Sequence, residues 1–183
     1  KGAKADDKDQ VVIKSDFAGP FKDTLKMADI ASGQAIDVPV QYYNSSQAVP
    51  VLSRTRPVAY LVLPGHEDID RKLKDQGLKS AALRFKQKLS AEAYQVTSKE
   101  TAGESEGRPV VQVETALKHV KKEFPKGTKV YVTAQPQTNL LSIALEPESV
   151  DSFVSTGYIS SEKGKELPVY RFMLDQKALH LQK

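Results

Sequence analysis

The stretch NLLSIALEPESVDSF, residues 139–153, places two carboxylates close together, with Glu146 and Glu148 on either side of Pro147. A pair of carboxylates can act in general acid–base catalysis, in which one group donates a proton while the other accepts one. The same residues are also typical of a helix end, because proline cannot donate an amide hydrogen bond to the preceding turn. At this point the sequence leaves open a catalytic pair or a structural corner.

The three histidines do not form a metal site that is recognisable from spacing. His66 is followed three residues later by Ile69 rather than by an acid, and His119 and His180 lie far apart in the chain. The usual zinc signatures, the phosphate-binding loop and the nucleophile elbow are also missing from the sequence. We therefore predict no catalytic residue and no metal ligand in this chain. A non-metal hydrolase would need carboxylates brought together from distant segments.

The composition is that of a folded domain without disulfide bonds. The chain has 183 residues, no cysteine and a net charge of +4, with 27 basic and 23 acidic residues largely intermixed. Nucleic-acid-binding proteins usually cluster their basic residues, so we expect no nucleic-acid partner. No apolar run approaches the length of about 20 residues that spans a bilayer. Because the chain begins at Lys1 rather than at methionine, we expect a processed or excised piece of a longer protein.

The elements that must position these residues are strands interrupted by two helices. The apolar run at 58–63 predicts a strand, the stretch 66–77 a short helix, and the stretch 78–85 a second strand. This order predicts a β-α-β unit with a parallel pair of strands. The prolines within 37–57 indicate short edge strands there.

After that unit, the pattern predicts an antiparallel meander. Alternating strands at 89–96, 110–120 and 129–134 are separated by a polar loop and by the turn FPKGT, in which Gly127 supplies a permissive backbone. A second helix follows Pro136. The predicted fold class is α+β: a mixed sheet with about two helices packed on it. We assign residues 1–15 to a linker or disordered segment, 16–174 to a single domain and 175–183 to a C-terminal tail.

Three tyrosines are the binding candidates that composition suggests. Tyr42 and Tyr43 are adjacent, so in a strand their side chains point to opposite faces. One of the two should pack inward while the other contacts a partner or a sugar, although packing alone is the simpler interpretation. Tyr158 is a third candidate for the same kind of site.

The structural interpretation of Glu146 is the stronger one. Pro147 disfavours helical geometry at the residue before it, so Glu146 should mark a helix end. A carboxylate there faces the negative end of the helix dipole, which is mildly unfavourable and leaves room for a cationic partner. The candidates for that partner are Arg54, Arg56 and Arg171.

Taken in order, several segments resemble a known family. The most specific are RPVAYL, FPKGT and the run that carries Gln135, Pro136, Asn139 and the residues 146–149. Over roughly residues 36–173 the chain resembles the region that follows the catalytic domain in a group of bacterial M14-family zinc carboxypeptidases.

The resemblance implies a parent enzyme that hydrolyses a C-terminal peptide bond or a cell-wall peptide, with zinc polarising the carbonyl group and activating water. The zinc-binding motif of that family does not occur in this chain, so no catalytic residue is carried over. The chain would then be a non-catalytic accessory domain of a periplasmic or extracellular enzyme, with its own catalytic domain as partner. The alternative is an autonomous module that binds peptide or cell-wall glycan.

Overall fold

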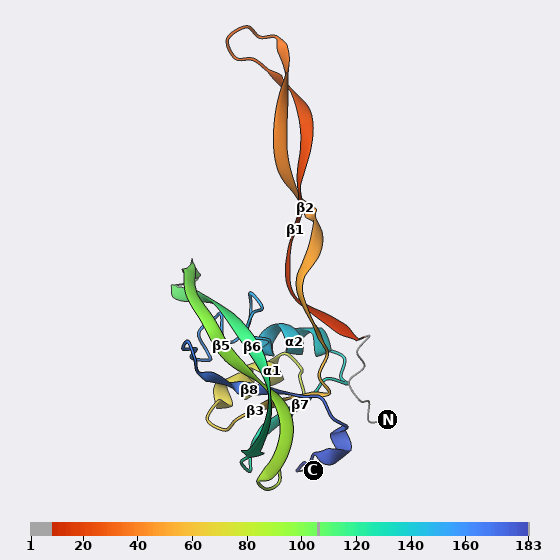
Figure 1. Cartoon of the computed structure of the whole chain (residues 1–183), viewed down its shortest axis with the longest axis vertical. Coiled ribbons are helices and arrows are strands. Elements are labelled where there is room, and N and C mark those ends of the chain that lie inside the picture. Colours follow the sequence, from red (N-terminus) through yellow and green to blue (C-terminus); the bar gives the residue numbers. More distant parts are fainter. Residues whose placement is uncertain (1–8, 106, 183) are drawn as a thin grey trace. The chain divides into compact units, whose positions relative to one another are not determined.

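The computed structural model describes residues 9–105 and 107–182, which divide into two compact units (Figure 1). One unit is Lys14–Leu52, called the hairpin below. The other combines residues 9–13 with residues 53–182 and is called the core unit. The sequence assigned 16–174 to one domain, whereas the structure gives 14–52 a unit of its own. Of the linker expected at 1–15, residues 1–8 lie outside the described part, and a strand begins at Gln10.

The described part of the chain is built mainly from strands. Its elements are β1 (Gln10–Ala28), β2 (Ala35–Thr55), β3 (Ala59–Val62), α1 (Glu67–Asp75), β4 (Ala81–Ala82), β5 (Gln87–Ser105), β6 (Arg108–Phe124), β7 (Lys129–Val132), α2 (Thr138–Leu145), β8 (Glu166–Phe172) and the 3-10 helix η1 (Gln176–Ala178). The two α-helices lie where the sequence predicted them, and the fold is broadly α+β.

Strands β1 and β2 form a two-stranded antiparallel ribbon. At its tip the Asp29 amide donates a hydrogen bond to the Gln34 carbonyl at 2.9 Å, and Gly33 turns the chain with a φ of 67°. The sequence indicated several short edge strands here, but β2 is one strand of 21 residues. Its prolines are tolerated because each strand of a two-stranded ribbon has a free edge, where a missing amide breaks no ladder.

The core unit holds a six-stranded sheet in the order β4-β7-β3-β8-β5-β6, in which the paired strands are antiparallel. The predicted mixed sheet is therefore wrong. Strand β7 lies between β3 and β4, so these two do not form the adjacent parallel pair expected of the β-α-β unit. The meander also fails after β6, because β7 pairs with β3 rather than with β6. Local alternation identifies strands, but the order of strands depends on long-range packing.

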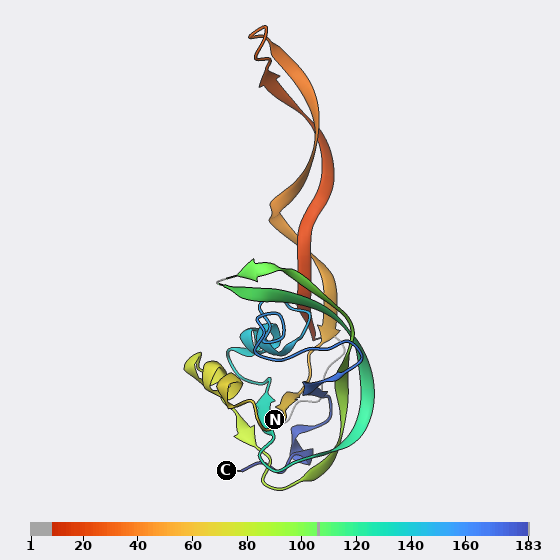
Figure 2. The same cartoon turned by 90° about the vertical axis from the view of Figure 1, so that its left-hand side faces the viewer.

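Both faces of this sheet are buried. Tyr60 and Val62 point to the face on which α1 and α2 pack through residues that include Leu73 and Leu141. The alternate residues of β3, among them Leu61, point to the other face. That second face is covered partly by the long ribbon of β5 and β6, which curves strongly (Figure 2). On the first face, the C-terminal end of α2 meets β3 where the Tyr60 hydroxyl donates a hydrogen bond to Glu146.

The segment expected to be a C-terminal tail packs on the core unit over its described residues. Leu179 is buried, and Leu181 forms an antiparallel bridge with Leu83. Within the described residues, neither helix has the length and apolarity needed to cross a membrane.

Truncation of Phe124 should test this core. Phe124 is fully buried and meets the Tyr170 ring edge-on at 5.0 Å. We expect Phe124→Ala to lower the free energy of unfolding by about 3–5 kcal/mol, measured by urea denaturation. The matched control is Phe85→Ala, because Phe85 is 48% exposed and should lose no more than about 1 kcal/mol. Equal losses for the two variants would contradict the packing described here.

Candidate functional site

Glu146 lies at the centre of a buried cluster of charged residues. It is the C-terminal capping residue of α2, with extended backbone geometry, and its side chain has no exposed surface. One carboxylate oxygen, Oε2, accepts a hydrogen bond from Arg54 Nη1 at 2.9 Å. The other, Oε1, accepts one from the Tyr60 hydroxyl at 2.8 Å and lies 3.4 Å from Arg171 Nε. Two of the three arginines considered from the sequence are therefore its partners.

Glu148 occupies the other side of Arg54. Its Oε2 accepts a hydrogen bond from Arg54 Nη2 at 2.6 Å, and its Oε1 accepts the backbone amide of Thr115 on β6. Arg54 thus bridges the two glutamates that flank Pro147, and it also donates to the Thr115 hydroxyl at 3.3 Å. Arg54 and Glu148 thus connect the corner after α2 to the C-terminal end of β2 and to β6.

Arg171 completes the cluster from β8. Its Nη1 donates to Glu92 Oε2 on β5 at 2.6 Å, and its Nη2 donates to the backbone carbonyl of Thr55. The side chain of Arg171 is only 3% exposed. We call Arg54, Glu92, Glu146, Glu148 and Arg171 the carboxylate cluster. Its formal charge is one negative unit, so Tyr60 and the Thr115 amide supply the additional hydrogen bonds that a buried carboxylate needs.

Arg56, the third arginine considered, has a different role. Its Nε pairs with Asp9 at 3.1 Å, and its two remaining nitrogens donate to Thr138 and Asn139 at 3.2 and 3.3 Å. Arg56 therefore fastens the first turn of α2 rather than the last. Pro136 lies just before that turn, outside the helix, where its restricted backbone breaks no hydrogen bond.

Two tyrosines border the cluster and remain neutral. Burial, reinforced by the charge of Glu146, raises the pKa of Tyr60 and of Tyr94 well above the ordinary value. The Arg54 guanidinium lies 5.6 Å from the centre of the Tyr94 ring. Burial acts to lower the pKa of Arg54, but the negative charges of Glu146 and Glu148 outweigh it and raise that pKa. Arg54 and the two phenols therefore keep their protons at neutral pH.

This geometry determines what the two glutamates can do. An acid or base in catalysis must come within hydrogen-bond reach of a substrate. Glu146 is fully enclosed, and its two oxygens are already engaged by Arg54, Arg171 and Tyr60. The arrangement suits a structural corner, in which the arginines neutralise a carboxylate at an unfavourable helix end.

Sequence reasoning did not identify Tyr60, Glu92, Tyr94 or Thr115 as members of this site. A usable signal was present in the strand LPVYRFM, which becomes β8. Leu167, Val169 and Arg171 share one face of this strand by alternation, so the arginine had to point into the core. A buried arginine requires carboxylates nearby.

A second ionic group links α1 to the sheet. Asp70 accepts hydrogen bonds from Tyr131 and Ser80 at 2.8 and 2.7 Å, and it pairs with Lys74 and Lys129 at 2.8 and 3.0 Å. Burial acts to raise the pKa of Asp70, but the hydrogen bonds from these four partners outweigh it. They hold its pKa well below the usual range.

The tyrosines proposed for binding fall in both units. Tyr42 and Tyr43 lie in the hairpin and are 45% and 61% exposed, and the Tyr42 ring contacts Phe21 with ring centres 5.7 Å apart. Tyr158 belongs to the core unit. It meets Phe153 edge-on at 5.8 Å, and the Lys72 amine lies 4.5 Å from its ring centre. Tyr158 is therefore packed, whereas the tyrosine pair remains largely exposed.

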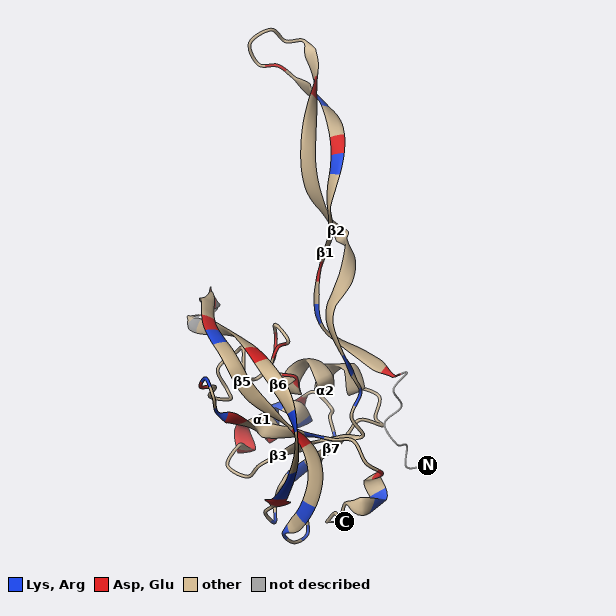
Figure 3. Cartoon of the chain, viewed as in Figure 1, with Lys and Arg blue, Asp and Glu red and all other residues tan. Residues whose placement is uncertain are grey.

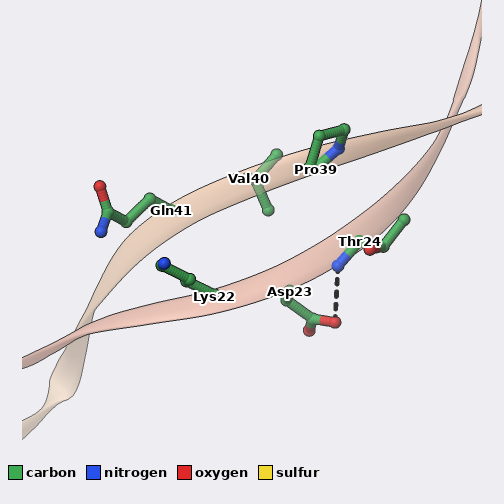
Figure 4. A pocket seen from close by; sticks show the side chains of 6 residues that line it. All are labelled: Lys22, Asp23, Thr24, Pro39, Val40 and Gln41. Carbon is green, nitrogen blue, oxygen red and sulfur yellow. Dashed lines mark hydrogen bonds between the residues drawn. The ribbon is translucent and has the colours of Figure 1, made fainter.

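The described residues contain open grooves but no metal centre. No group of three or more histidine, aspartate or glutamate side chains within 9–105 and 107–182 is placed to hold a metal ion. A groove of about 390 Å³ in the core unit is lined by residues that include Ala91, Val120 and Met173. A second, shallow groove follows the hairpin, where Lys22, Asp23 and Gln41 are among its lining residues (Figure 4). Basic and acidic residues are interspersed along the strands rather than gathered (Figure 3).

Comparison with known proteins relates the chain to a portion of carboxypeptidases. It is 33% identical over 161 residues to carboxypeptidase 2 of Trichophyton rubrum and 32% identical over 161 residues to carboxypeptidase 2 of Trichophyton equinum. Each match covers 87% of this chain and 30% of the relative. The chain thus spans less than a third of the length of these relatives.

A third relative is also matched over less than a third of its length. Probable carboxypeptidase 2 of Arthroderma benhamiae is 30% identical over 141 residues, which are 76% of this chain and 27% of that protein. These relatives are fungal, whereas the sequence resemblance pointed to bacterial enzymes. No protein-family model and no solved structure matches the chain.

Removal of the charge from Glu146 should destabilise the fold. Glu146→Gln keeps the shape of the side chain but leaves Arg54 and Arg171 without their shared carboxylate. We expect the free energy of unfolding to fall by about 3 kcal/mol or more, measured by urea denaturation. Glu162→Gln is the control, because Glu162 is exposed and should change stability by less than about 0.5 kcal/mol. Equal free energies of unfolding for the two variants would contradict a structural role for Glu146.

Asp70 should make the stability depend on acid pH. Because its pKa is depressed in the folded state, the stability it contributes is present above the unfolded-state pKa of about 4 and is lost as the pH falls toward the folded pKa. Asp70→Asn should be less stable than the wild type by about 1–3 kcal/mol at pH 7. That difference should shrink in unfolding curves recorded from pH 5 down to pH 2. A constant difference across this range would contradict the assignment.

Proposed function

We propose that this chain is a non-catalytic accessory domain of a zinc metallocarboxypeptidase of the M14 type. In this proposal the chain follows the catalytic domain and either stabilises that domain or binds a substrate or partner. The main support for the proposal is the match of 161 residues to carboxypeptidase 2 of Trichophyton rubrum. That match covers only 30% of the relative. A carboxypeptidase of that length has room for a catalytic domain outside the matched region.

The chemistry of the described side chains supports a structural role for this portion. The carboxylates that looked most like an acid–base pair, Glu146 and Glu148, are both bound to Arg54. The described donor set does not fit a zinc ion, because no three suitable ligands converge in it. The zinc of the proposed enzyme would therefore be held by the catalytic domain, and no chemical step is assigned to this chain. A secreted enzyme, periplasmic or extracellular, is part of the proposal.

A second candidate is an autonomous peptide- or glycan-binding module. Strand β6 is an edge strand of the sheet, and the apolar groove of about 390 Å³ borders it at Val120. An extended peptide can add to such an edge through backbone hydrogen bonds. Exposed Tyr43 in the hairpin is the residue that best fits contact with a sugar ring. Retention of the purified chain on peptide arrays or on peptidoglycan would favour this candidate.

The accessory-domain proposal predicts where activity should lie. The longer protein encoded by the same gene should release the C-terminal residue from a peptide, and a zinc chelator should abolish that release. The 183-residue chain alone should release none at the same molar concentration. Activity that copurifies with the isolated chain, and that Glu146→Gln or chelator alters, would overturn the proposal. An encoded protein without carboxypeptidase activity would overturn it as well.

A further inference from the structure

One face of the hairpin collects exposed apolar side chains. The rings of Phe21 and Tyr42 are in contact across the two strands. Because side chains alternate along a strand, the odd positions of β1 and the even positions of β2 therefore share this face. We call it the apolar face and define it by five residues that are each 40–51% exposed: Phe21, Leu25, Met27, Ile36 and Tyr42.

Between Lys22 and Gln41 the opposite face of the ribbon is mainly polar, whereas Tyr43, Val49 and Val51 on the rest of that face are exposed apolar residues. Lys22 and Thr24 alternate with the apolar residues of β1, and Gln41 alternates with those of β2. The shallow groove of Figure 4 is lined by residues of both faces, and in it the Asp23 carboxylate accepts a hydrogen bond from the Thr24 amide at 2.7 Å. The part of the ribbon from Phe21 to Tyr42, apolar on one face and mainly polar on the other, has the pattern of a strand pair that packs one face against another surface.

The hairpin has no third element of its own to cover the apolar face. The unit Lys14–Leu52 consists of two strands and the turn between them. An isolated two-stranded hairpin is marginally stable in water, and independent stability usually needs a further strand or a packed helix. Burying the apolar face would contribute roughly 25 cal/mol for each Å² removed from water. Both stability and solubility therefore favour an occupant for this face.

Asp23 indicates what kind of occupant fits. By alternation it lies on the apolar face, between Phe21 and Leu25, and no ion pair is formed by it among the described residues. A second copy of the hairpin would present another Asp23 and no lysine or arginine on the corresponding face. Burial of an unpaired carboxylate is costly, so a different surface that carries a cation is favoured over self-association.

The relatives are much longer than this chain. Less than a third of their length corresponds to this chain, so most of each polypeptide lies outside the matched region. A surface on the same polypeptide is present at high effective concentration, which favours docking even through a modest apolar area.

We propose that the apolar face docks on the catalytic part of the longer carboxypeptidase polypeptide, at an apolar patch that places a lysine or arginine opposite Asp23. This inference rests on the proposed function and adds the contact surface and its chemistry. The hairpin then acts as the arm that fixes the accessory domain to the enzyme, while its polar face stays in water.

Hydrogen–deuterium exchange tests this inference in the longer protein encoded by the gene. Amides of 14–52 should exchange at least about tenfold more slowly in the longer protein than in the isolated 183-residue chain, because docking suppresses opening of the ribbon. Leu25→Lys in the longer protein should return the rates to those of the isolated chain. Thr24→Lys is the matched control, since it places the same charge on the polar face and should leave the protection intact.

Several results would overturn the inference. They are equal exchange in the two proteins, protection that survives Leu25→Lys, or a natural polypeptide that consists of these 183 residues alone. A concentration-dependent dimer of the isolated chain that Leu25→Lys dissociates would assign the apolar face to a second copy instead. The same preparation is assayed for chelator-sensitive peptide hydrolysis. Peptide hydrolysis without slowed exchange in 14–52 would support the proposed function and contradict the docking. Slowed exchange without hydrolysis would support the docking of the hairpin and contradict the proposed function.

Discussion

Glu146 is a fully buried carboxylate at the C-terminal end of a helix, and its burial constrains much of the core unit. A buried carboxylate there needs cationic partners. Arg54 and Arg171, from two strands that are distant in the sequence, provide them. The two arginines are themselves held by Glu148 and Glu92, and Tyr60 donates the remaining hydrogen bond from the central strand β3. The position of α2 on the sheet is thereby linked to Arg54 at the end of β2 and to strands β3, β5 and β8 of the core unit.

Such a cluster specifies an arrangement more than it adds stability. Taking five charges out of water is expensive, and hydrophobic residues of similar volume often do as well or better. Breaking one contact is nevertheless costly, because it leaves an uncompensated charge in the interior. The cluster therefore favours one packing of the helix and strands over alternatives. The same pairing leaves Glu146 and Glu148 without freedom to exchange protons with a substrate, which agrees with the proposal that catalysis lies elsewhere in the longer protein.

Local features of this fold were accessible from sequence, whereas the strand order was not. The charge distribution and apolar spacing of 67–75 predicted α1, and Pro147 predicted the end of α2 at Glu146. The insertion of β7 between β3 and β4 was not predicted, because alternation defines a strand without naming its neighbours. For the carboxylate cluster, the sequence limited the arginine partners of Glu146 to three candidates. It did not identify Glu92 or Tyr94, because their places in the cluster are set by the pairing of strands that lie far apart in the sequence. The hairpin was missed as a separate unit because its prolines suggested short strands.

The coupling between Glu146 and Arg54 is the interaction on which the packing of α2 depends most. A double-mutant cycle with Glu146→Gln, Arg54→Met and the double variant measures that coupling from unfolding free energies. We expect the double variant to be more stable than the sum of the two single losses implies, by about 1–3 kcal/mol. Losses that add to within about 0.5 kcal/mol would contradict this coupling, because independent residues add within that margin.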